Sequence, residues 1–415
     1  MEHFVIRGGR PLSGVIPISG AKNAALPACV ASLLTDEQVI IDHVPHLRDV
    51  STILSTISSL GKRVVRDENS VSIAGGEDLH SEAQAAFVEQ MRASFLVLGP
   101  LVARLGRAVV PLPGGCKIGA RPVDLHLFGL RKLGAQVSEG QNAVTLIAKR
   151  LRGAKISLPF PSVGATEQIA MSATLAAGET VIENAAWEPE VMALVSLLGK
   201  MGAEIEYRNG SLYIQGTIGL HGARHAVIPD RMEAGTYLLA AAITNGAVTV
   251  QQIIPEHLRS LLSLLAQAGC DIDEADDAIT LAMNGRPQPI KTATAPYPGF
   301  PTDLQPPLVA LLSLTEGESI VEERIFENRF NYTSTLRMMG ARIDVRERRA
   351  VIAGVDELHA AAASAPDIRA GAALILAALA AKGESTIDNL EQIDRGYESL
   401  AQKLRGVGGA IERIS

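Results

Sequence analysis

The hydrophobic and polar positions of the chain repeat in one long pattern. A run with apolar residues at i, i+3, i+4 and i+7 ends at a glycine, and short runs of alternating apolar and polar residues follow it. The pattern occurs six times, with its glycines 67 to 73 residues apart. A unit of this length is too long for a solenoid repeat and predicts a small folded module. The six corner glycines are Gly61, Gly134, Gly202, Gly269, Gly340 and Gly408.

Residues 163–216 show which elements each module contains. ATEQIAMSATLAAGE predicts an alanine-rich helix that stops at Gly178, and TVIEN predicts a strand. WEPEVMALVSLLGKMGA predicts a second, amphipathic helix. EIEYR and SLYIQG predict two strands joined by a turn at Asn209 and Gly210. Each module is therefore βαβαββ-like, and three modules can bury their alanine-rich helices against one another.

The six modules predict an α/β fold with two lobes of three modules each. The stretches before and after Pro229 hold different candidate chemistry, and VIPDR at residues 227–231 is a plausible crossing point between them. A chain of 415 residues with 47% apolar residues has ample material for two domains. A cleft between two lobes is a common place for a ligand.

Charge and hydropathy exclude several classes of partner. The net charge of −7 gives no basic field for nucleic acid, so an anionic ligand needs locally placed cations. The apolar stretch at residues 95–112 contains Arg104 and Arg107, and the one at residues 371–381 is too short to span a bilayer. MEHFVIRGGR has no apolar segment typical of a signal peptide. We expect a cytoplasmic protein that binds neither membranes nor nucleic acid.

The three cysteines differ in their surroundings. They form no CxxC pair and no even disulfide framework, as expected in a reducing compartment. Cys29 lies in an apolar helix and Cys270 follows a corner glycine, so both are expected to be buried small hydrophobic residues. Cys116 lies among glycines in LPGGCKIGARPVDLH, close to Lys117 and Arg121. A thiol in a loop near cations is a candidate acid or nucleophile.

Two polar residues precede apolar helices. SGAKNAALP, residues 19–27, places Lys22 at a helix start that Ser19 or Asn23 can cap, which is a natural anion site; an exposed lysine is an equally good interpretation. PGFPTDLQ, residues 298–305, places Asp303 at another helix start. The commoner interpretation of such an aspartate is an N-cap, and the functional one is a general base.

Arginines recur at the starts of helices or in loops of different modules. For any single arginine, solvent exposure is the default expectation. Several at equivalent positions beside alanine-rich helices suggest a ring of guanidinium groups suited to phosphate and carboxylate. The candidates are Arg92, Arg231, Arg329, Arg369 and Arg395.

The common nucleotide and metal motifs are missing from the sequence. It contains no GxxxxGK[ST], no HExxH, no zinc-type spacing of Cys and His, and no Rossmann GxGxxG. A nucleotide hydrolase, a metalloenzyme and a dehydrogenase are therefore disfavoured, and we expect neither a metal nor a cofactor.

Taken together, the long motifs resemble the UDP-N-acetylglucosamine 1-carboxyvinyltransferase family, the enolpyruvyl transferases of the EPSP synthase-like superfamily that begin peptidoglycan synthesis. The resemblance runs from Phe4 to the last module. Its motifs are SGAKNAALP, MRAS, LGPLVAR, PGGCKIGARPVDLH, SVGAT, ENAAWEPE, PDRMEAGT, FPTDLQ, FENRF and IDRGYE.

The resemblance implies a fold and a reaction. The fold would be a two-lobed inside-out α/β barrel, with residues 22–229 in the lobe that carries Cys116 and residues 1–21 plus 230–415 in the other, and the active site between them. The reaction would move the enolpyruvyl group of phosphoenolpyruvate to the 3′-hydroxyl of UDP-N-acetylglucosamine and release phosphate. The family is also alkylated by fosfomycin, an epoxide.

The resemblance also implies roles for individual residues. Cys116 would protonate the methylene carbon of phosphoenolpyruvate, and Asp303 would accept the proton of the sugar hydroxyl. The phosphate and carboxylate would lie among Lys22, Asn23, Arg92, Arg121, Arg369 and Arg395, with Lys22 and Arg395 also counted as catalytic. The UDP-sugar would contact Asn23, Arg92, Arg121, Pro122, Val123, Asp124, Leu125, Ser162, Val163, Gly164, Asp303, Ile325 and Arg329.

Departures from the family pattern keep other functions open. Phe160 and Pro161 stand before SVGAT where relatives commonly place a lysine, and Pro306 and Pro307 follow the Asp303 motif. An enolpyruvyl transferase of the same fold that uses another uridine nucleotide is the nearest alternative. A non-catalytic UDP-sugar sensor is the alternative from a different class. Enzymes acting on shikimate phosphate lack the Cys116 segment and are disfavoured.

Overall fold

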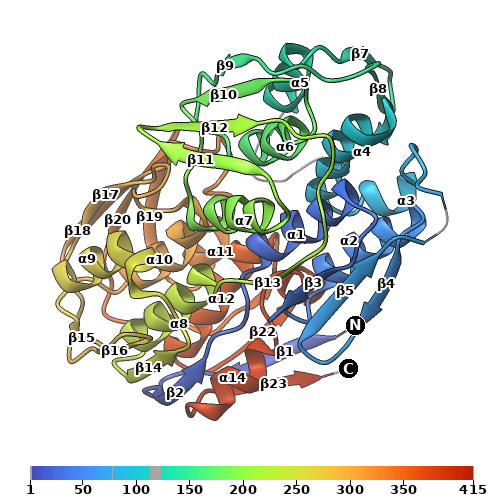
Figure 1. Cartoon of the computed structure of the whole chain (residues 1–415). Helices are drawn as coiled ribbons and strands as arrows, with labels where there is room; N and C mark the ends of the chain where they lie inside the picture. Colours follow the sequence, from blue (N-terminus) through green and yellow to red (C-terminus); the bar gives the residue numbers. More distant parts are fainter. Residues whose placement is uncertain (1, 77, 113–122, 415) are drawn as a thin grey trace. The chain divides into compact units, whose positions relative to one another are not determined.

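The computed structural model describes residues 2–76, 78–112 and 123–414 (Figure 1). They divide into two compact units. Residues 2–19 and 229–414 form one, which we call the Asp303 unit, and the described residues between 20 and 228 form the other, the Lys22 unit. Within the Asp303 unit the amide of Asp230 donates to the carbonyl of Ser19, and within the Lys22 unit the amide of Ala21 donates to the carbonyl of Ile228.

The described residues form three sheets in each unit. In the Asp303 unit the strands, in sheet order, are β15 (Asp271–Glu274), β16 (Ala278–Ala282), β14 (Ala247–Gln251) and β2 (Ser13–Pro17); β17 (Lys291–Ala293), β18 (Glu318–Glu322), β20 (Arg349–Ala353) and β19 (Arg342–Arg346); and β21 (Ala362–Ser364), β22 (Glu384–Asp388), β1 (His3–Arg7) and β23 (Ala410–Ile414).

The Lys22 unit repeats this arrangement. Its sheets are β13 (Ala223–Ala226), β3 (Val39–Asp42), β5 (Ser70–Ala74) and β4 (Arg63–Arg66); β11 (Glu204–Arg208), β12 (Ser211–Gln215), β10 (Glu179–Glu183) and β9 (Lys155–Ser157); and β6 (Arg107–Pro111), β8 (Ala143–Ile147) and β7 (Gln136–Glu139). The third sheet has only three strands, but Glu82 forms a parallel bridge with Val109 where the others have a fourth strand.

Each of the five four-stranded sheets combines one parallel pairing with antiparallel ones. In the sheet of β10, the strand pairs in parallel with β9 and antiparallel with β12, with Ile182 opposite both Ile156 and Leu212. Strands β2 and β13 pair far from their sequence neighbours, β2 with β14 and β13 with β3. Strand β1 likewise pairs with β22 and β23. N-terminal strands thus join two sheets of the Asp303 unit, and β13 from the end of the Lys22 unit joins one of its sheets.

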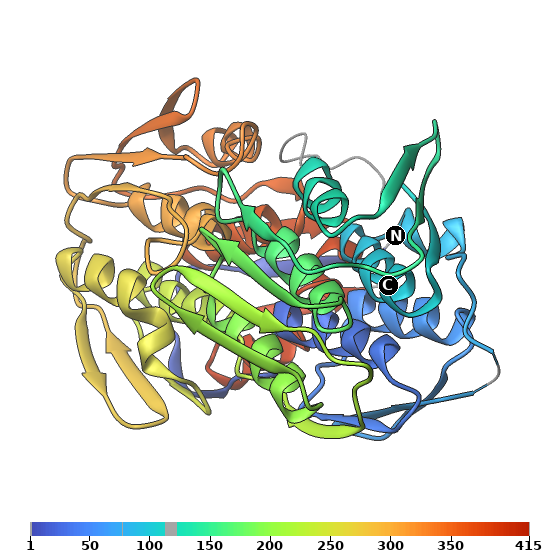
Figure 2. The same cartoon turned by 45° about the horizontal axis from the view of Figure 1, so that its top comes forward.

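Buried helices, most of them rich in alanine, form the core of each unit. In the Asp303 unit α8 (Arg231–Ile243), α10 (Gln305–Leu312) and α12 (Ile368–Ala380) pack against one another and are buried almost throughout their length, as expected for helices that are apolar on all sides. In the Lys22 unit the corresponding helices are α1 (Lys22–Ala31), α4 (Leu98–Leu105) and α6 (Val163–Ala173). Figure 2 shows the green strands of the β10 sheet lying over α6 and α7 (Pro189–Lys200).

The amphipathic helices end at the predicted corner glycines. These helices are α2 (Arg48–Ser59), α5 (Asp124–Lys132), α7, α9 (Arg259–Gln267), α11 (Thr333–Met338) and α14 (Leu400–Gly406). All six glycines have φ between 91° and 100°, and the amide after each glycine donates to a carbonyl five residues earlier at 2.9–3.4 Å. This is a Schellman motif, and its left-handed residue favours glycine. The α/β class and its sixfold repetition are confirmed.

Short helices complete the described chain, and one of them, η4, contains Asp303. They are η1 (Ser32–Leu34), α3 (Ala85–Val88), η2 (Arg92–Val97), η3 (Pro255–Leu258), η4 (Thr302–Leu304) and α13 (Glu391–Asp394). The predicted module at residues 163–216 appears as α6, β10, α7, β11 and β12, and Asn209 and Gly210 form its turn with φ of 51° and 75°. No helix among the described residues is long and apolar enough to cross a membrane.

Candidate active site

Asp303 lies in the short helical turn η4, which leads directly into the buried helix α10. Pro306 and Pro307 occupy the first turn of α10, where the amides that proline lacks have no partner within a helix. The N-cap interpretation of Asp303 is wrong. Pro301 precedes η4 in the cap position, and the bonds of the Asp303 carboxylate run to arginine side chains from distant segments.

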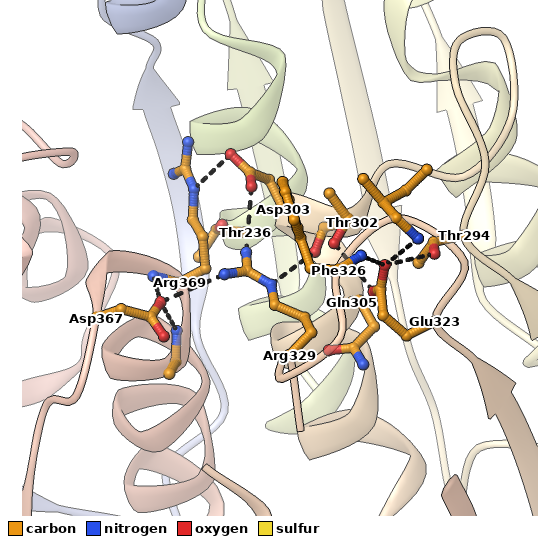
Figure 3. Close-up of polar contacts among 12 residues, drawn as sticks. Thr236, Thr294, Thr302, Asp303, Gln305, Glu323, Phe326, Arg329, Asp367 and Arg369 are labelled. Carbon is orange, nitrogen blue, oxygen red and sulfur yellow. Dashed lines mark hydrogen bonds and ion pairs between the residues drawn. The ribbon is translucent and has the colours of Figure 1, made fainter. Parts of the chain in front are cut away.

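The Asp303 carboxylate is held between two buried guanidinium groups (Figure 3). Arg329 donates from Nη2 to Oδ1 at 3.1 Å, and Arg369 donates from Nε to Oδ2 at 3.1 Å. The side chains of Arg329 and Arg369 are only 2% and 4% exposed, whereas that of Asp303 is 29% exposed. The expectation of solvent-exposed arginines is wrong at both positions, and the carboxylate stays partly accessible.

Arg329 also ties Asp303 to the start of α12. Its Nε donates to the carbonyl of Thr302 at 3.3 Å, and its Nη1 lies 3.6 Å from Oδ1 of Asp367. Asp367 is the N-cap of α12, because the same Oδ1 accepts the amides of Arg369 and Ala370 at 2.9 and 3.0 Å. The position of Arg369 therefore depends on the same aspartate that pairs with Arg329.

Arg369 is held in a strongly polar environment. Burial by itself would lower the pKa of its guanidinium, but Tyr397, Asp303 and Asp230 outweigh this effect and raise the pKa above its ordinary value. The Tyr397 ring lies 5.2 Å from the guanidinium carbon, and its hydroxyl is 2.9 Å from Oγ1 of Thr236. Arg369 Nη1 is buried without a hydrogen-bond partner among the described residues. A bound anion would satisfy this group.

The other two candidate arginines of this unit lie at helix ends. Arg231 is the first residue of α8 and is buried, with its guanidinium carbon 5.4 Å from the ring of Tyr297. Arg395 follows α13 and donates from Nη1 to Oε1 of Gln392 at 3.2 Å.

In the Lys22 unit, Lys22 begins α1 and forms a buried ion pair. Its Nζ donates to Oδ2 of Asp49 at 3.3 Å, and the side chains are 10% and 5% exposed. The interpretation of Lys22 as an exposed lysine is therefore wrong. The capping prediction is also wrong, because Ala21 occupies the N-cap without a side-chain bond, Asn23 lies inside the helix and Ser19 belongs to the other unit. A buried ammonium at a helix start still fits an anion site.

The remaining predicted contacts of this unit lie at other helix starts. Arg92 begins η2 and is half-buried. Ser162 caps α6, accepting the amide of Ala165 at 3.4 Å, and is followed by Val163 and Gly164. A side chain at Gly164 would lie 3.0 Å from the ring of His126, so the backbone approaches that imidazole closely. At the start of α5 lie Val123, Asp124 and Leu125, with Asp124 exposed.

The described cysteines fit the prediction made for them. Cys29 and Cys270 are free thiols in the cores of their units, and burial raises the pKa of each to about 12. Neither is poised to react as a thiolate at neutral pH. Cys116, Arg121 and Pro122 lie outside the described residues, so their roles stay predictions.

Comparison with known proteins places the whole chain in one family. A family model described as EPSP synthase (3-phosphoshikimate 1-carboxyvinyltransferase) matches residues 6–404. The chain belongs to the EPSP synthase family. Within this family it is 48% identical over 418 residues to UDP-N-acetylglucosamine 1-carboxyvinyltransferase 2 of Carboxydothermus hydrogenoformans, with 100% of both chains covered. It is also 48% identical over 419 residues to UDP-N-acetylglucosamine 1-carboxyvinyltransferase of Koribacter versatilis, covering 100% of this chain and 97% of the relative.

Solved structures agree on the EPSP synthase fold. The enolpyruvyl transferase NikO from Streptomyces tendae matches with a TM-score of 0.91 at 24% identity, covering 99% of this chain and 98% of the other. EPSP synthase from Acinetobacter baumannii matches with a TM-score of 0.76 at 18% identity, covering 100% of both chains. At these identities the two structures support the fold alone.

Three residues of this EPSP synthase family member were not anticipated from the sequence, although two had a signal. Asp367 stands in PDIRAG, which parallels PDRMEAG, where Asp230 also caps a buried helix. Glu323 continues the buried face of β18 after Ser319 and Val321, and a charged residue at such a position is unusual. Asp49 carries no comparable signal, because its contact with Lys22 joins two different helices.

Proposed function

We propose that this chain transfers the enolpyruvyl group of phosphoenolpyruvate to the 3′-hydroxyl of UDP-N-acetylglucosamine with release of phosphate, the first committed step of peptidoglycan synthesis. The observation that carries the proposal is the 48% identity, over the entire chain, to relatives named for this activity. The cytoplasm, where we expect the chain to act, is part of the same proposal.

The reaction adds an alcohol across the double bond of an enol phosphate and then eliminates phosphate, which leaves an enol ether. As the 3′-oxygen attacks C2 of phosphoenolpyruvate, Asp303 takes the hydroxyl proton and Cys116 gives a proton to the methylene carbon. The tetrahedral intermediate then loses phosphate from C2 and a proton from the new methyl group, which restores the double bond. Acid and base catalysis by positioned side chains of this kind typically contributes about 10²–10⁴-fold to a rate.

The environment of Asp303 suits the role of base. Its two oxygens accept hydrogen bonds from two guanidinium groups, which fix the orientation of the carboxylate. Its side chain is partly exposed, so a substrate hydroxyl can reach it. The base would act from a fixed position, because Arg329 and Arg369 are themselves buried and anchored.

Cations around the donor would balance its charge. Phosphoenolpyruvate carries a phosphate and a carboxylate, and both stay charged in the intermediate. Arg369 Nη1, which has no hydrogen-bond partner in the described part of the chain, and the buried ammonium of Lys22 support anion binding in their units. Arg92, Arg121 and Arg395 complete the proposed set. In the same proposal, residues 121–125 and 162–164 bind the uridine diphosphate, and Asn23, Arg329 and the backbone of Ile325 contact the sugar.

Phosphate release with a panel of acceptors tests the proposed function. The purified chain is expected to release phosphate from phosphoenolpyruvate only when UDP-N-acetylglucosamine is also present. Release with a different uridine nucleotide alone would move the assignment to another acceptor. Binding of UDP-N-acetylglucosamine without release with any acceptor would favour the sensor.

A further inference from the structure

A buried carboxylate, that of Glu323, lies close to the turn that carries Asp303. Glu323 directly follows strand β18 and is 1% exposed. None of the described lysines or arginines forms an ion pair with it, so the charge is compensated by hydrogen bonds instead. Burial of a charge without a cation is costly, and a buried glutamate at the end of a strand is therefore unusual for a residue that serves the fold alone.

Four donors converge on the two oxygens of Glu323 (Figure 3). Oε1 accepts the hydroxyl of Thr294 at 2.9 Å and the amides of Ile325 and Phe326 at 2.8 and 3.1 Å. Oε2 accepts the hydroxyl of Thr302 at 3.0 Å. Both oxygens are thus engaged: Oε1 connects to Thr294 and to the turn at residues 325–326, and Oε2 connects to Thr302.

We call the hydrogen bonds of each Glu323 oxygen an arm. The Oε2 arm, formed by the Thr302 hydroxyl, leads to Asp303. Thr302 is the first residue of η4 and immediately precedes Asp303. The carbonyl of Thr302 accepts Nε of Arg329, which also donates to the Asp303 carboxylate. Glu323 therefore fixes the turn that carries the proposed base from one side, while Arg329 fixes it from the other.

The Oε1 arm leads to the turn that carries Ile325. The hydrogen bonds donated by the amides of Ile325 and Phe326 fold residues 323–326 back onto the carboxylate. Thr294 strengthens this arm, because its hydroxyl donates to Glu323 and accepts the amide of Arg324 at 2.8 Å. The backbone of Ile325 is the group proposed above to contact the sugar.

We propose that Glu323 is a positioning residue that sets the distance between the base Asp303 and the sugar-binding backbone at Ile325. This inference rests on the proposed function. One side chain joins the two segments, so the base stays at a fixed distance from the acceptor hydroxyl of the bound sugar. A misplacement of about 1 Å between reacting groups can lower a rate by about 100-fold.

Substitution of the threonine in one arm at a time distinguishes an effect on the positions of the reacting groups from an effect on folding. Thr302→Val removes the Oε2 arm and is expected to lower kcat about 10-fold or more, with the KM for UDP-N-acetylglucosamine within about 3-fold of the original. Thr294→Val loosens the Oε1 arm and is expected to raise that KM about 10-fold with a smaller loss of kcat. The matched control is Thr315→Val, since Thr315 is buried at the opposite end of α10 and its hydroxyl donates to Leu312.

Variants of Glu323 itself complete the experiment. Glu323→Gln keeps the length and one accepting oxygen, and its amide can donate to the Thr302 hydroxyl, so kcat is expected within about 5-fold of the original. In Glu323→Asp the shorter side chain cannot reach both segments, so kcat is expected to fall by about 100-fold. Thermal unfolding of all variants, compared with Thr315→Val, removes the contribution of simple destabilisation.

The outcomes distinguish this inference from the proposed function. A split between kcat for Thr302→Val and KM for Thr294→Val supports positioning. If Thr302→Val and Thr294→Val keep the kinetics of Thr315→Val, Glu323 serves the fold alone and the inference is wrong. If the unchanged chain releases no phosphate with UDP-N-acetylglucosamine, the proposed function fails, and the inference fails with it.

Discussion

Asp303 and Arg369 are joined by a hydrogen bond of 3.1 Å between Oδ2 and Nε, although 66 residues separate them in the sequence. Arg329 approaches the other oxygen at the same distance. The arrangement brings together the starts of α10 and α12, two of the three helices that form the core of the Asp303 unit. The proposed base is thus anchored by two buried arginine side chains at the starts of core helices.

Removal of the Asp303 charge should abolish most turnover while binding persists. Asp303→Asn keeps the shape of the side chain but loses the ability to take a proton, so kcat is expected to fall by about 10²-fold or more. Steady-state phosphate release measures the loss, and calorimetric titration with UDP-N-acetylglucosamine measures the retained binding. Asp276→Asn, at an exposed position of the same unit, is the matched control. Undiminished kcat in Asp303→Asn would mean that another group accepts the proton.

Removal of Arg329 should destabilise the fold as well as the site. Arg329→Leu leaves Asp303 and Asp367 without their shared cation, and breaking a buried pair typically costs about 3–5 kcal/mol. Addition of Asp367→Asn to this variant should recover part of the loss, because one uncompensated charge is removed.

Chemical unfolding of the single and double variants checks this prediction. The control is Arg346→Leu, whose pair with Asp344 is at the surface and whose side chain is 86% exposed, so its stability should barely change. Equal losses in Arg329→Leu and Arg346→Leu would contradict the role assigned to Arg329.

The cysteines should differ sharply in reactivity. Cys29 and Cys270 are buried thiols whose pKa burial raises to about 12, so the native chain should not be alkylated there near neutral pH. Fosfomycin should add once, at Cys116. Peptide mapping by mass spectrometry locates the adduct, and the same reagent on Cys116→Ser is the control. An adduct at Cys29 or Cys270 in the native chain would contradict this ranking.

The free energy of unfolding of the chain should depend on pH because of Glu233. This residue of α8 is 2% exposed, accepting Nζ of Lys403 at 2.7 Å and the amide of Ser19 at 2.8 Å. Burial raises its pKa to about 6 from an ordinary value of 4.5, although Lys403 opposes the shift. Below 4.5 the carboxyl is protonated in the folded and unfolded states alike. As the pH rises to 6, only the unfolded chain releases the proton readily, so stability falls by about 2 kcal/mol.

Comparison of variants isolates this contribution. The difference in unfolding free energy between the unchanged chain and Glu233→Gln should shift by about 2 kcal/mol between about pH 4 and pH 7, and Glu316→Gln, at an exposed position, should show no such shift. A constant difference for Glu233→Gln would show that the carboxyl titrates at its ordinary pKa.

Local patterns predicted the modules of the fold well. The left-handed residue after each amphipathic helix favours glycine, and the tight turn at Asn209 and Gly210 favours these two residues. Both features can therefore be predicted from short stretches of sequence. The pairing of β2 with β14 and of β13 with β3 cannot be predicted from short stretches of sequence. It depends on which sheet edges remain open once the rest of the unit has folded.

The site was predicted in part, and the errors have a common cause. Asp303 and Lys22 were singled out, but each was also given a capping or exposed interpretation that suits an isolated helix start. The deciding partners, Arg329, Arg369 and Asp49, come from other modules or helices. Glu323 was overlooked because its four donors come from three separate segments, although its place on the buried face of β18 was a usable signal.

The most direct measurement is the structure of the product formed from phosphoenolpyruvate and UDP-N-acetylglucosamine. Nuclear magnetic resonance of the purified product should show a carboxyvinyl group on the 3′-oxygen of the sugar, formed in equal amount with the released phosphate. A carboxyvinyl group on another oxygen or another acceptor, or phosphate released without a coupled product, would contradict the proposed reaction.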